Sequence, residues 1–140
     1  MGEMEVPSDI LHGASTQRAV LNFPISGRPV PAAVIQAFAH LKEACAGVNE
    51  ELGRLEPSVA EAIAQAAQTI RAGLNGEGGA LVSGSEGRQA MDHFPVDVFQ
   101  TGSGTSTNMN VNEVLSNLAC LAAGQPIGAK NPVHPNDHAN

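Results

Sequence analysis

The sequence has no tryptophan and no tyrosine, and it contains only two cysteines, Cys45 and Cys120. The core must therefore be built from aliphatic side chains and four phenylalanines, which favours packed helices over an aromatic-rich sandwich. Two cysteines are too few to ligate an iron–sulfur cluster. Because both stand in apolar segments with helical patterns, we expect buried thiols in a reducing compartment, not a disulfide.

Basic residues are also scarce, since seven Lys and Arg stand against fourteen Asp and Glu, and the net charge is −7. Without a basic cluster, nucleic acids and anionic membranes are poor partners. No apolar run approaches the ~20 residues of a membrane span, and no signal-peptide pattern opens the chain. The sequence predicts a cytoplasmic protein, or a mitochondrial-matrix protein in a eukaryote, that holds any anionic ligand through local donors.

Helical periodicity is clearest in the middle of the chain. A helix is predicted from Pro31 to Gly53, because apolar residues recur there at alternating steps of four and three. The stripe that we expect to be buried comprises Val34, Phe38, Leu41, Cys45, Val48 and Leu52. A second helix is predicted from Pro57 to Gly73, and the short link before it predicts an antiparallel pair.

Two further helices flank this pair in the sequence. Residues 15–23 are expected to form a short helix with Ser15 as its N-cap. A third long helix is expected from about Asn108 to Ala123, where apolar residues again recur at helical spacing and Gly124 follows as a stop.

The segment between the second and third long helices lacks helical periodicity. Residues 73–93 are rich in glycine and predict a flexible loop, and residues 94–100 predict a short extended segment. We therefore expect a single helical domain over residues 1–140, mainly α with at most a small antiparallel β element.

The first segment with chemical potential is the run Gly102, Ser103, Gly104 and Thr105, which precedes the third long helix. Glycines let backbone N–H groups approach a ligand, and a helix start offers unpaired N–H donors and a partial positive charge. The hydroxyls of Ser103 and Thr105 add donors, so the run predicts a cradle for a carboxylate or phosphate. The alternative is a simple helix cap. A phosphate P-loop is excluded, because the required Gly-Lys-Ser/Thr ending is missing.

Three asparagines follow at alternate positions and so point around the helix, not to one side of it. Asn108, nearest the loop, is the candidate for contact with a ligand. Asn110, Asn112 and Glu113 are expected to cap and hold the loop instead.

The third segment, residues 134–138, brings a histidine, an amide and a carboxylate into one proline-stiffened loop. A polar pocket for an organic acid and a structural Asx-turn at Asn136 and Asp137 are both compatible with it. The spacing of His134 and His138 suits a metal on a helix, but Pro135 argues against a helix, so we predict no metal site.

These segments together resemble one known family. "QTGSGTSTNMNVNEVLSN" (residues 100–117) looks like the signature of class II fumarate hydratases, and "VHPNDHAN" (residues 133–140) resembles the substrate-binding loop that follows it. "GASTQRAVLNFPIS" (residues 13–26) and "DHFPVDVFQ" (residues 92–100) also fit. The resemblance runs over nearly the whole chain. It implies that residues 1–140 are the helical N-terminal domain of a class II fumarase-like protein, without the central helical-bundle and C-terminal domains of the family.

The resemblance implies reversible hydration of fumarate to (S)-malate by a homotetramer without a metal or organic cofactor. It assigns substrate carboxylate binding to Ser103, Gly104, Thr105 and Asn108. It assigns a second dicarboxylate site to His134, Pro135, Asn136 and Asp137. No catalytic residue is expected in this chain, because the family carries its catalytic groups in later segments. The 140 residues alone are therefore expected to be inactive.

Two alternatives stay open. Aspartases of the same superfamily share the asparagine-rich helix, but they usually have Gly-Ala-Gly-Thr in place of Gly102–Thr105 and asparagine in place of His134, so fumarate hydration is favoured over ammonia elimination. The chain alone could also be a catalytically silent, oligomerising domain. One departure from the family concerns the second site, where Asn131 stands at a position that is often arginine and Lys130 lies beside it.

Overall fold

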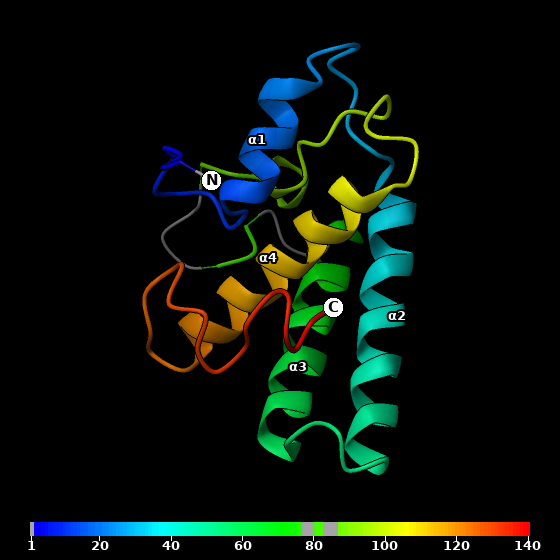
Figure 1. Cartoon of the computed structure of the whole chain (residues 1–140), viewed down its shortest axis with the longest axis vertical. Helices are drawn as coiled ribbons and strands as arrows, with labels where there is room; N and C mark the ends of the chain where they lie inside the picture. Colours follow the sequence, from blue (N-terminus) through cyan, green and yellow to red (C-terminus); the bar gives the residue numbers. More distant parts are fainter. Residues whose placement is uncertain (1, 77–79, 83–86) are drawn as a thin grey trace.

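A computed structural model describes residues 2–76, 80–82 and 87–140 (Figure 1). Its elements are the helices α1 (Ala14–Asn22), α2 (Ala32–Glu51), α3 (Pro57–Leu74) and α4 (Thr105–Ala122), and the 3-10 helix η1 (Ala90–His93). Within these ranges there is no strand, and the β structure is one isolated antiparallel bridge between Pro29 and Asp97. The predicted mainly α fold is confirmed. No helix in the same ranges is long and apolar enough to span a membrane.

Helices α2 and α3 form an antiparallel pair (Figure 1). Gly53 ends α2 with a left-handed backbone, φ +66°, which glycine adopts without strain. Pro57 is the first residue of α3, a position where proline's missing N–H removes no helical hydrogen bond. These two residues explain why the link between the helices is short.

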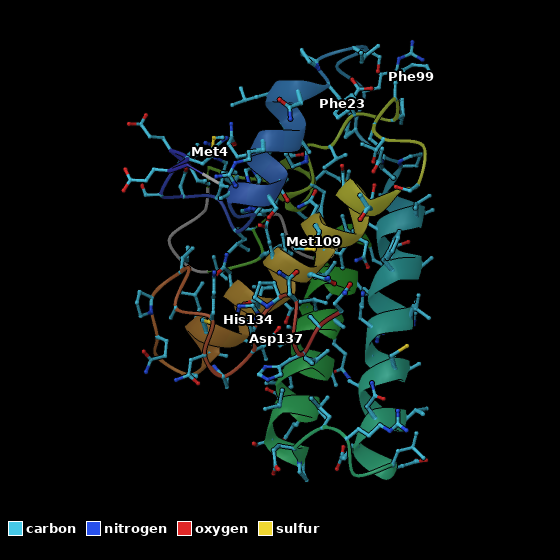
Figure 2. The ribbon with its side chains drawn as sticks, viewed as in Figure 1. Met4, Phe23, Phe99, Met109, His134 and Asp137 are labelled. Carbon is cyan, nitrogen blue, oxygen red and sulfur yellow. The ribbon has the colours of Figure 1, made fainter. Side chains whose placement is uncertain are left out.

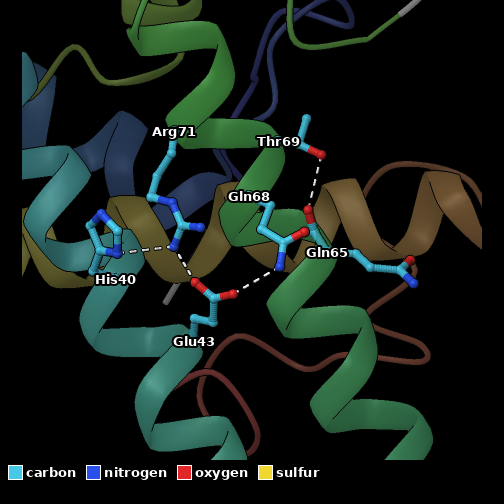
Figure 3. A network of polar contacts seen from close by, with 6 residues as sticks. All are labelled: His40, Glu43, Gln65, Gln68, Thr69 and Arg71. Carbon is cyan, nitrogen blue, oxygen red and sulfur yellow. Dashed lines mark hydrogen bonds and ion pairs between the residues drawn. The ribbon is translucent and has the colours of Figure 1, made fainter.

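A polar network ties α2 to α3 on their solvent side (Figure 3). The Arg71 guanidinium forms an ion pair with the Glu43 carboxylate and lies 3.1 Å from His40 Nδ1. Gln68 Nε2 donates a hydrogen bond to Glu43 Oε1 at 2.8 Å. The hydrogen bonds from Gln68 and Arg71 lower the pKa of the Glu43 carboxyl.

Helix α4 lies in the middle of the molecule, where it crosses α3 obliquely and contacts α1, α2 and α3 (Figure 1). Every residue from Asn110 to Cys120 is buried, and α4 begins at Thr105, earlier than predicted. Its apolar residues share one cluster with side chains from the rest of the chain, including Leu11, Ile35, Ala67, Ile70, Phe94, Val111, Val114 and Leu115. The predicted apolar stripe of this helix is therefore buried up to Leu118, and Leu121 is half-buried.

The buried side of α2 differs from the predicted one. The residues that α2 buries are Ile35, Ala39, Lys42 and Ala46. Val34, Leu41, Val48 and Leu52 are between 41% and 63% exposed, and Cys45 is also exposed. The prediction of a buried Cys45 thiol is wrong, and so is that of a buried stripe apart from Phe38, which is half-buried against the core. The reason is that α3 and α4 pack on one side of α2. Burial on that side lowers the pKa of the Lys42 ammonium.

The segment between α3 and α4 is only partly described. Residues 77–79 and 83–86 of the predicted loop 73–93 lie outside the described residues, while Leu81 and Ala90 are buried. A Cβ at Gly73 would stand 2.4 Å from Leu81 Cδ2, so glycine is what allows Leu81 to pack against the end of α3. The predicted extended segment reduces to the single bridge, with Val30 N–H donating to Val96 O and Val98 N–H donating to Arg28 O.

Asp97 fastens this bridge to the turn at residues 26–27. Its carboxylate accepts hydrogen bonds from the N–H groups of Ser26 at 2.7 Å, Gly27 at 2.8 Å and Phe99 at 2.9 Å, and from the Ser26 hydroxyl. The donors, of which the Phe99 N–H has the largest effect, lower the pKa of Asp97 to about 2. Asp97 therefore stays ionised while it holds the two segments together.

We expect Asp97→Asn to lower the urea midpoint of unfolding at pH 7 and to lose that deficit in acid. The folded pKa of about 2 lies below the ordinary value of 3.8, so the stabilisation is fully present above 3.8 and is lost as the pH falls through 2. Urea titrations of both proteins at pH 7, 4 and 2.5 measure the gap between their urea midpoints. A gap that stays constant across this series would show that the carboxylate charge is not what stabilises the turn.

Candidate functional site

The loop before α4 is built around a tight turn. The Gly104 N–H donates to Thr101 O at 3.1 Å, and Gly104 stands at the N-cap with φ +70°. A left-handed backbone costs other residues roughly 1–2 kcal/mol. Glycine at position 104 therefore lets the chain pass directly from the loop into the first helical residue, Thr105.

Gln100 holds both ends of this loop together. Its Oε1 accepts a hydrogen bond from the Thr107 N–H at 2.9 Å, and its Nε2 donates to Thr107 Oγ1 at 2.5 Å. Gln100 is not among the site residues predicted from the sequence. The available signal was an amide two residues before Gly102, because an amide can donate and accept at once.

The donors of this loop face solvent. Gly102, Ser103 and Thr105 are exposed, and Asn108 is half-buried. No side chain caps α4, and its first turn contains no acidic residue. In the described part of the chain, no acceptor is recorded for the N–H groups of Thr105 and Ser106, which the helix itself leaves unpaired. The arrangement offers backbone and hydroxyl donors to an anion without a competing carboxylate.

We expect Gly104→Ala to lower the free energy of unfolding by about 1–2 kcal/mol, because alanine must adopt the left-handed backbone. The loss is conformational, since an added Cβ meets no atom within 4 Å. Gly102→Ala is the matched control, because its Cβ also meets open space and no positive φ is recorded there. Urea denaturation that shows equal losses for the two variants would contradict the role given to Gly104.

The asparagines of α4 bond to segments other than the Gly102–Thr105 loop, so the prediction that Asn110 and Asn112 hold this loop is wrong. Asn110 Nδ2 donates to His93 O at 2.9 Å, and Asn112 Nδ2 donates to Asn140 Oδ1 at 3.2 Å. Asn108 Nδ2 donates to the same Asn140 oxygen at 2.8 Å. The amide nitrogen of Asn108 is therefore engaged by the C-terminal segment, and substrate contact through Asn108 remains a prediction.

Glu113 holds the start of α1. Its carboxylate accepts hydrogen bonds from the N–H groups of Gly13 at 2.9 Å, Ser15 at 2.9 Å and Thr16 at 3.1 Å, and from Thr16 Oγ1 at 2.6 Å. A Cβ at Gly13 would stand 2.8 Å from Glu113 Oε1, so glycine is needed there. The predicted N-cap at Ser15 is wrong, because Gly13 is the N-cap residue and a carboxylate from α4 satisfies the donors.

Two more polar residues of α4 fix the segments around it. Ser116 Oγ donates to Val133 O at 2.6 Å. Asn117 Nδ2 donates to Leu11 O at 2.7 Å, and Asn117 Oδ1 accepts from the Gly128 N–H at 2.8 Å. Helix α4 thus anchors the N-terminal segment and the C-terminal loops from one buried polar side.

The loop of residues 134–138 closes on itself. The His134 N–H donates to His138 Nδ1 at 2.9 Å, and the N–H groups of Asn136 and Asp137 each lie 3.3 Å from His134 Nδ1. If His134 Nδ1 accepts these bonds, the ring proton stands on Nε2. His134 Nδ1 also lies 3.3 Å from Asp137 Oδ2, a contact that becomes an ion pair when the ring is protonated. Pro135 is buried, whereas Asn136 and Asp137 are exposed.

A cavity of about 890 Å³ lies beside this loop. Its lining includes His12, Arg18, Lys130, His134 and Asn136, so two cationic side chains and two imidazoles share it. Met109 of α4 and His134 both line this cavity, and Figure 2 labels them together with Asp137, which lies beside His134. Glu113 also lines the cavity, but its carboxylate already accepts hydrogen bonds from the start of α1. The positive charges of Arg18 and Lys130 therefore suit the cavity to an anionic ligand.

The structure keeps the two predicted sites apart along α4. Ser103, Gly104, Thr105 and Asn108 do not line the cavity beside His134. The sites are joined by the bond from Asn108 to Asn140, which follows the His134 loop. The two predicted groups of residues therefore lie at separate places in the fold.

A sequence profile of a family described as lyases matches residues 2–140. The chain belongs to this lyase family. Fumarate hydratase class II 1 of Pseudomonas aeruginosa is 50% identical to the lyase chain over 140 residues, which are 100% of this chain and 27% of the relative. The mitochondrial fumarate hydratase of Mus musculus is 49% identical over 142 aligned residues, covering 99% of this chain and 25% of the relative.

Solved structures agree with these relatives. The lyase chain is similar to the Brucella melitensis fumarate lyase:delta crystallin, with a TM-score of 0.84 and 38% identity over 99% of this chain and 29% of that one. It is also similar to the class II fumarase of Schistosoma mansoni, with a TM-score of 0.81 and 36% identity over 99% of this chain and 26% of that one. The resemblance to class II fumarate hydratases is confirmed, and the chain spans about a quarter of the length of the relatives it matches.

Proposed function

We propose that this lyase chain supplies the substrate-carboxylate loops of a fumarate hydratase, which interconverts fumarate and (S)-malate. The observation that carries the proposal is the Gly102–Thr105 loop, where exposed hydroxyls and a helix start without acidic residues form a neutral anion cradle. The relatives named as fumarate hydratases support the choice of substrate.

In the proposed main site, Ser103, Gly104, Thr105 and Asn108 bind one substrate carboxylate. Removal of a proton from the carbon next to that carboxylate builds negative charge onto its oxygens. Donors that hold this charge more tightly than the ground-state carboxylate lower the barrier. The α4 start suits this role, because its N–H groups and partial positive charge are fixed before the reaction begins.

The proposed second site binds a dicarboxylate at His134, Pro135, Asn136 and Asp137. The cavity beside these residues supports it, because cationic Lys130 and Arg18 line the cavity. Lys130 supplies a positive charge next to Asn131, the position that is often arginine in the family.

The catalytic groups are proposed to come from segments outside these 140 residues, within a homotetramer of the cytoplasm or mitochondrial matrix that needs no metal or organic cofactor. The chain alone is therefore expected to be inactive. The described sites offer donors and anion-binding side chains, which supports a substrate-binding role for these residues.

The substrate is tested on the longer protein, in which this chain is joined to the remaining segments that its relatives carry. Given fumarate, this protein is expected to form (S)-malate, which is measured as loss of the fumarate double-bond absorbance. Given aspartate, it is expected to release no ammonia. Ammonia release without fumarate hydration would overturn the proposal in favour of an aspartase-like lyase.

A further inference from the structure

One side of α2 is apolar and uncovered. It consists of Val34, Ala37, Leu41, Ala44, Cys45, Val48 and Leu52, all exposed, and is called the α2 face here. Leu41 is 55% exposed and Leu52 63%. Helix α2 lies at the edge of the molecule, with α3 and α4 to one side of it (Figure 1). Contiguous exposed apolar surface of this kind marks an interaction site.

The α2 face has the spacing of a coiled-coil seam. Together with half-buried Phe38, its larger residues stand at positions 34, 38, 41, 45, 48 and 52, in steps of four and three. A strict seven-residue repeat of this form presents a narrow stripe that another helix can follow along its length. The side of α2 that packs in the core is a second, separate stripe. The occupant of the α2 face is therefore a helix with matching spacing.

We propose that this occupant is the α2 face of a second copy of the chain, packed antiparallel. The seam is self-complementary about a point between Leu41 and Cys45. Antiparallel pairing sets Leu41 against Cys45 of the second copy, Val34 against its Leu52, and Phe38 against its Val48. Each of these three pairs joins a larger side chain to a smaller one. The two helices can therefore pack along the seam without a polar residue between them.

The charges of α2 favour the antiparallel orientation. Glu50 and Glu51 lie in the last turn without a basic residue, and the first turn has no acidic residue. Both carboxylates therefore stand at the negative end of the helix dipole. An antiparallel second copy brings its positive helix start beside them, whereas a parallel copy brings the two acidic ends together. Lys42, next to the seam, is 8% exposed and lies on the covered side.

Sedimentation of the 140-residue chain across a concentration series tests the pairing, which does not depend on the proposed function. The wild-type chain is expected to form dimers. Leu41→Asp is expected to weaken dimerisation by about tenfold or more, because a carboxylate in an apolar seam is desolvated without a partner. Leu21→Asp is the matched control, since Leu21 is 59% exposed on α1 and outside the α2 face.

Circular dichroism should show that both variants keep their helices, since both leucines are exposed. A wild-type chain that stays monomeric over the whole series would overturn the proposal and leave the face to another partner. Equal weakening by Leu41→Asp and Leu21→Asp would overturn it as well.

Disulfide formation tests the orientation, because it requires Cα atoms within about 7 Å. A chain with Leu41→Cys and Cys45→Ser is mixed with a wild-type chain of different mass and oxidised gently. Antiparallel pairing is expected to give the mixed disulfide between positions 41 and 45. A disulfide between two wild-type chains through Cys45, without the mixed product, would establish parallel pairing and overturn the proposed orientation. Cys120 is buried and does not compete.

Discussion

Glu113→Ala is expected to lower the free energy of unfolding by about 3–5 kcal/mol. The two buried donors of Thr16 left without a partner cost about 1–3 kcal/mol each, and the half-buried donors of Gly13 and Ser15 lose their acceptor as well. Four donors from Gly13, Ser15 and Thr16 converge on this carboxylate, which is 7% exposed. Without it, the start of α1 has no acceptor recorded in the described part of the chain, and α1 is expected to detach from α4. Urea denaturation followed by circular dichroism measures the loss.

Two further variants make this result specific. Glu61→Ala removes an exposed carboxylate from α3 that bonds only to Gln65 in the described structure, and its effect should stay within about 0.5 kcal/mol. Glu113→Gln keeps one acceptor oxygen but turns an amide nitrogen toward N–H donors, so its loss should fall between the other two. Equal losses for Glu113→Ala and Glu61→Ala would mean that the carboxylate does not hold α1.

Thr105→Val in the longer protein is expected to lower kcat for fumarate hydration by roughly 10²–10³-fold, the usual effect of removing one donor to a developing negative charge. The substitution keeps the shape of the side chain and removes the hydroxyl. Thr105 is exposed and no hydrogen bond of its hydroxyl is recorded among the described residues, so the stability of the protein should not change. Steady-state rates and thermal unfolding of the same preparation separate the two effects.

Thr69→Val is the matched control for this prediction. Thr69 is an exposed helical threonine on α3 whose hydroxyl donates to Gln65 O at 3.0 Å (Figure 3). Thr69 lies outside both candidate sites, so the turnover of the Thr69→Val variant should equal that of the unmodified protein. Unchanged turnover in Thr105→Val would remove Thr105 from the site, and a fall in both variants would point to a general effect of the substitution.

The long helices could be predicted from the sequence because their signals are local. Apolar periodicity identified α2, α3 and α4, while Gly53 and Pro57 marked the link between two of them. The buried polar side of α4 could not be predicted in the same way. Glu113 bonds to Ser15 across 98 residues of sequence and Asn117 to Leu11 across 106, and no local pattern specifies such partners.

The same reason explains the error on α2. Its sequence carries two apolar stripes, one ending in the core at Ala46 and one exposed through Leu41 and Val48. Periodicity shows that each stripe exists, but which one the chain covers depends on where α3 and α4 pack. For the candidate site, the residue types of the Gly102–Thr105 loop were read from the sequence, whereas its closure by Gln100 became apparent only in the folded chain.

The most direct test of the proposed function is fumarate hydration by the 140-residue chain beside the longer protein, followed as loss of the fumarate double-bond absorbance. We expect activity in the longer protein and none in the 140-residue chain, because carboxylate binding is proposed for the described loops and the catalytic groups are proposed to lie in other segments. Hydration by the 140-residue chain alone would contradict it, since the catalytic base would then have to be among residues 1–140.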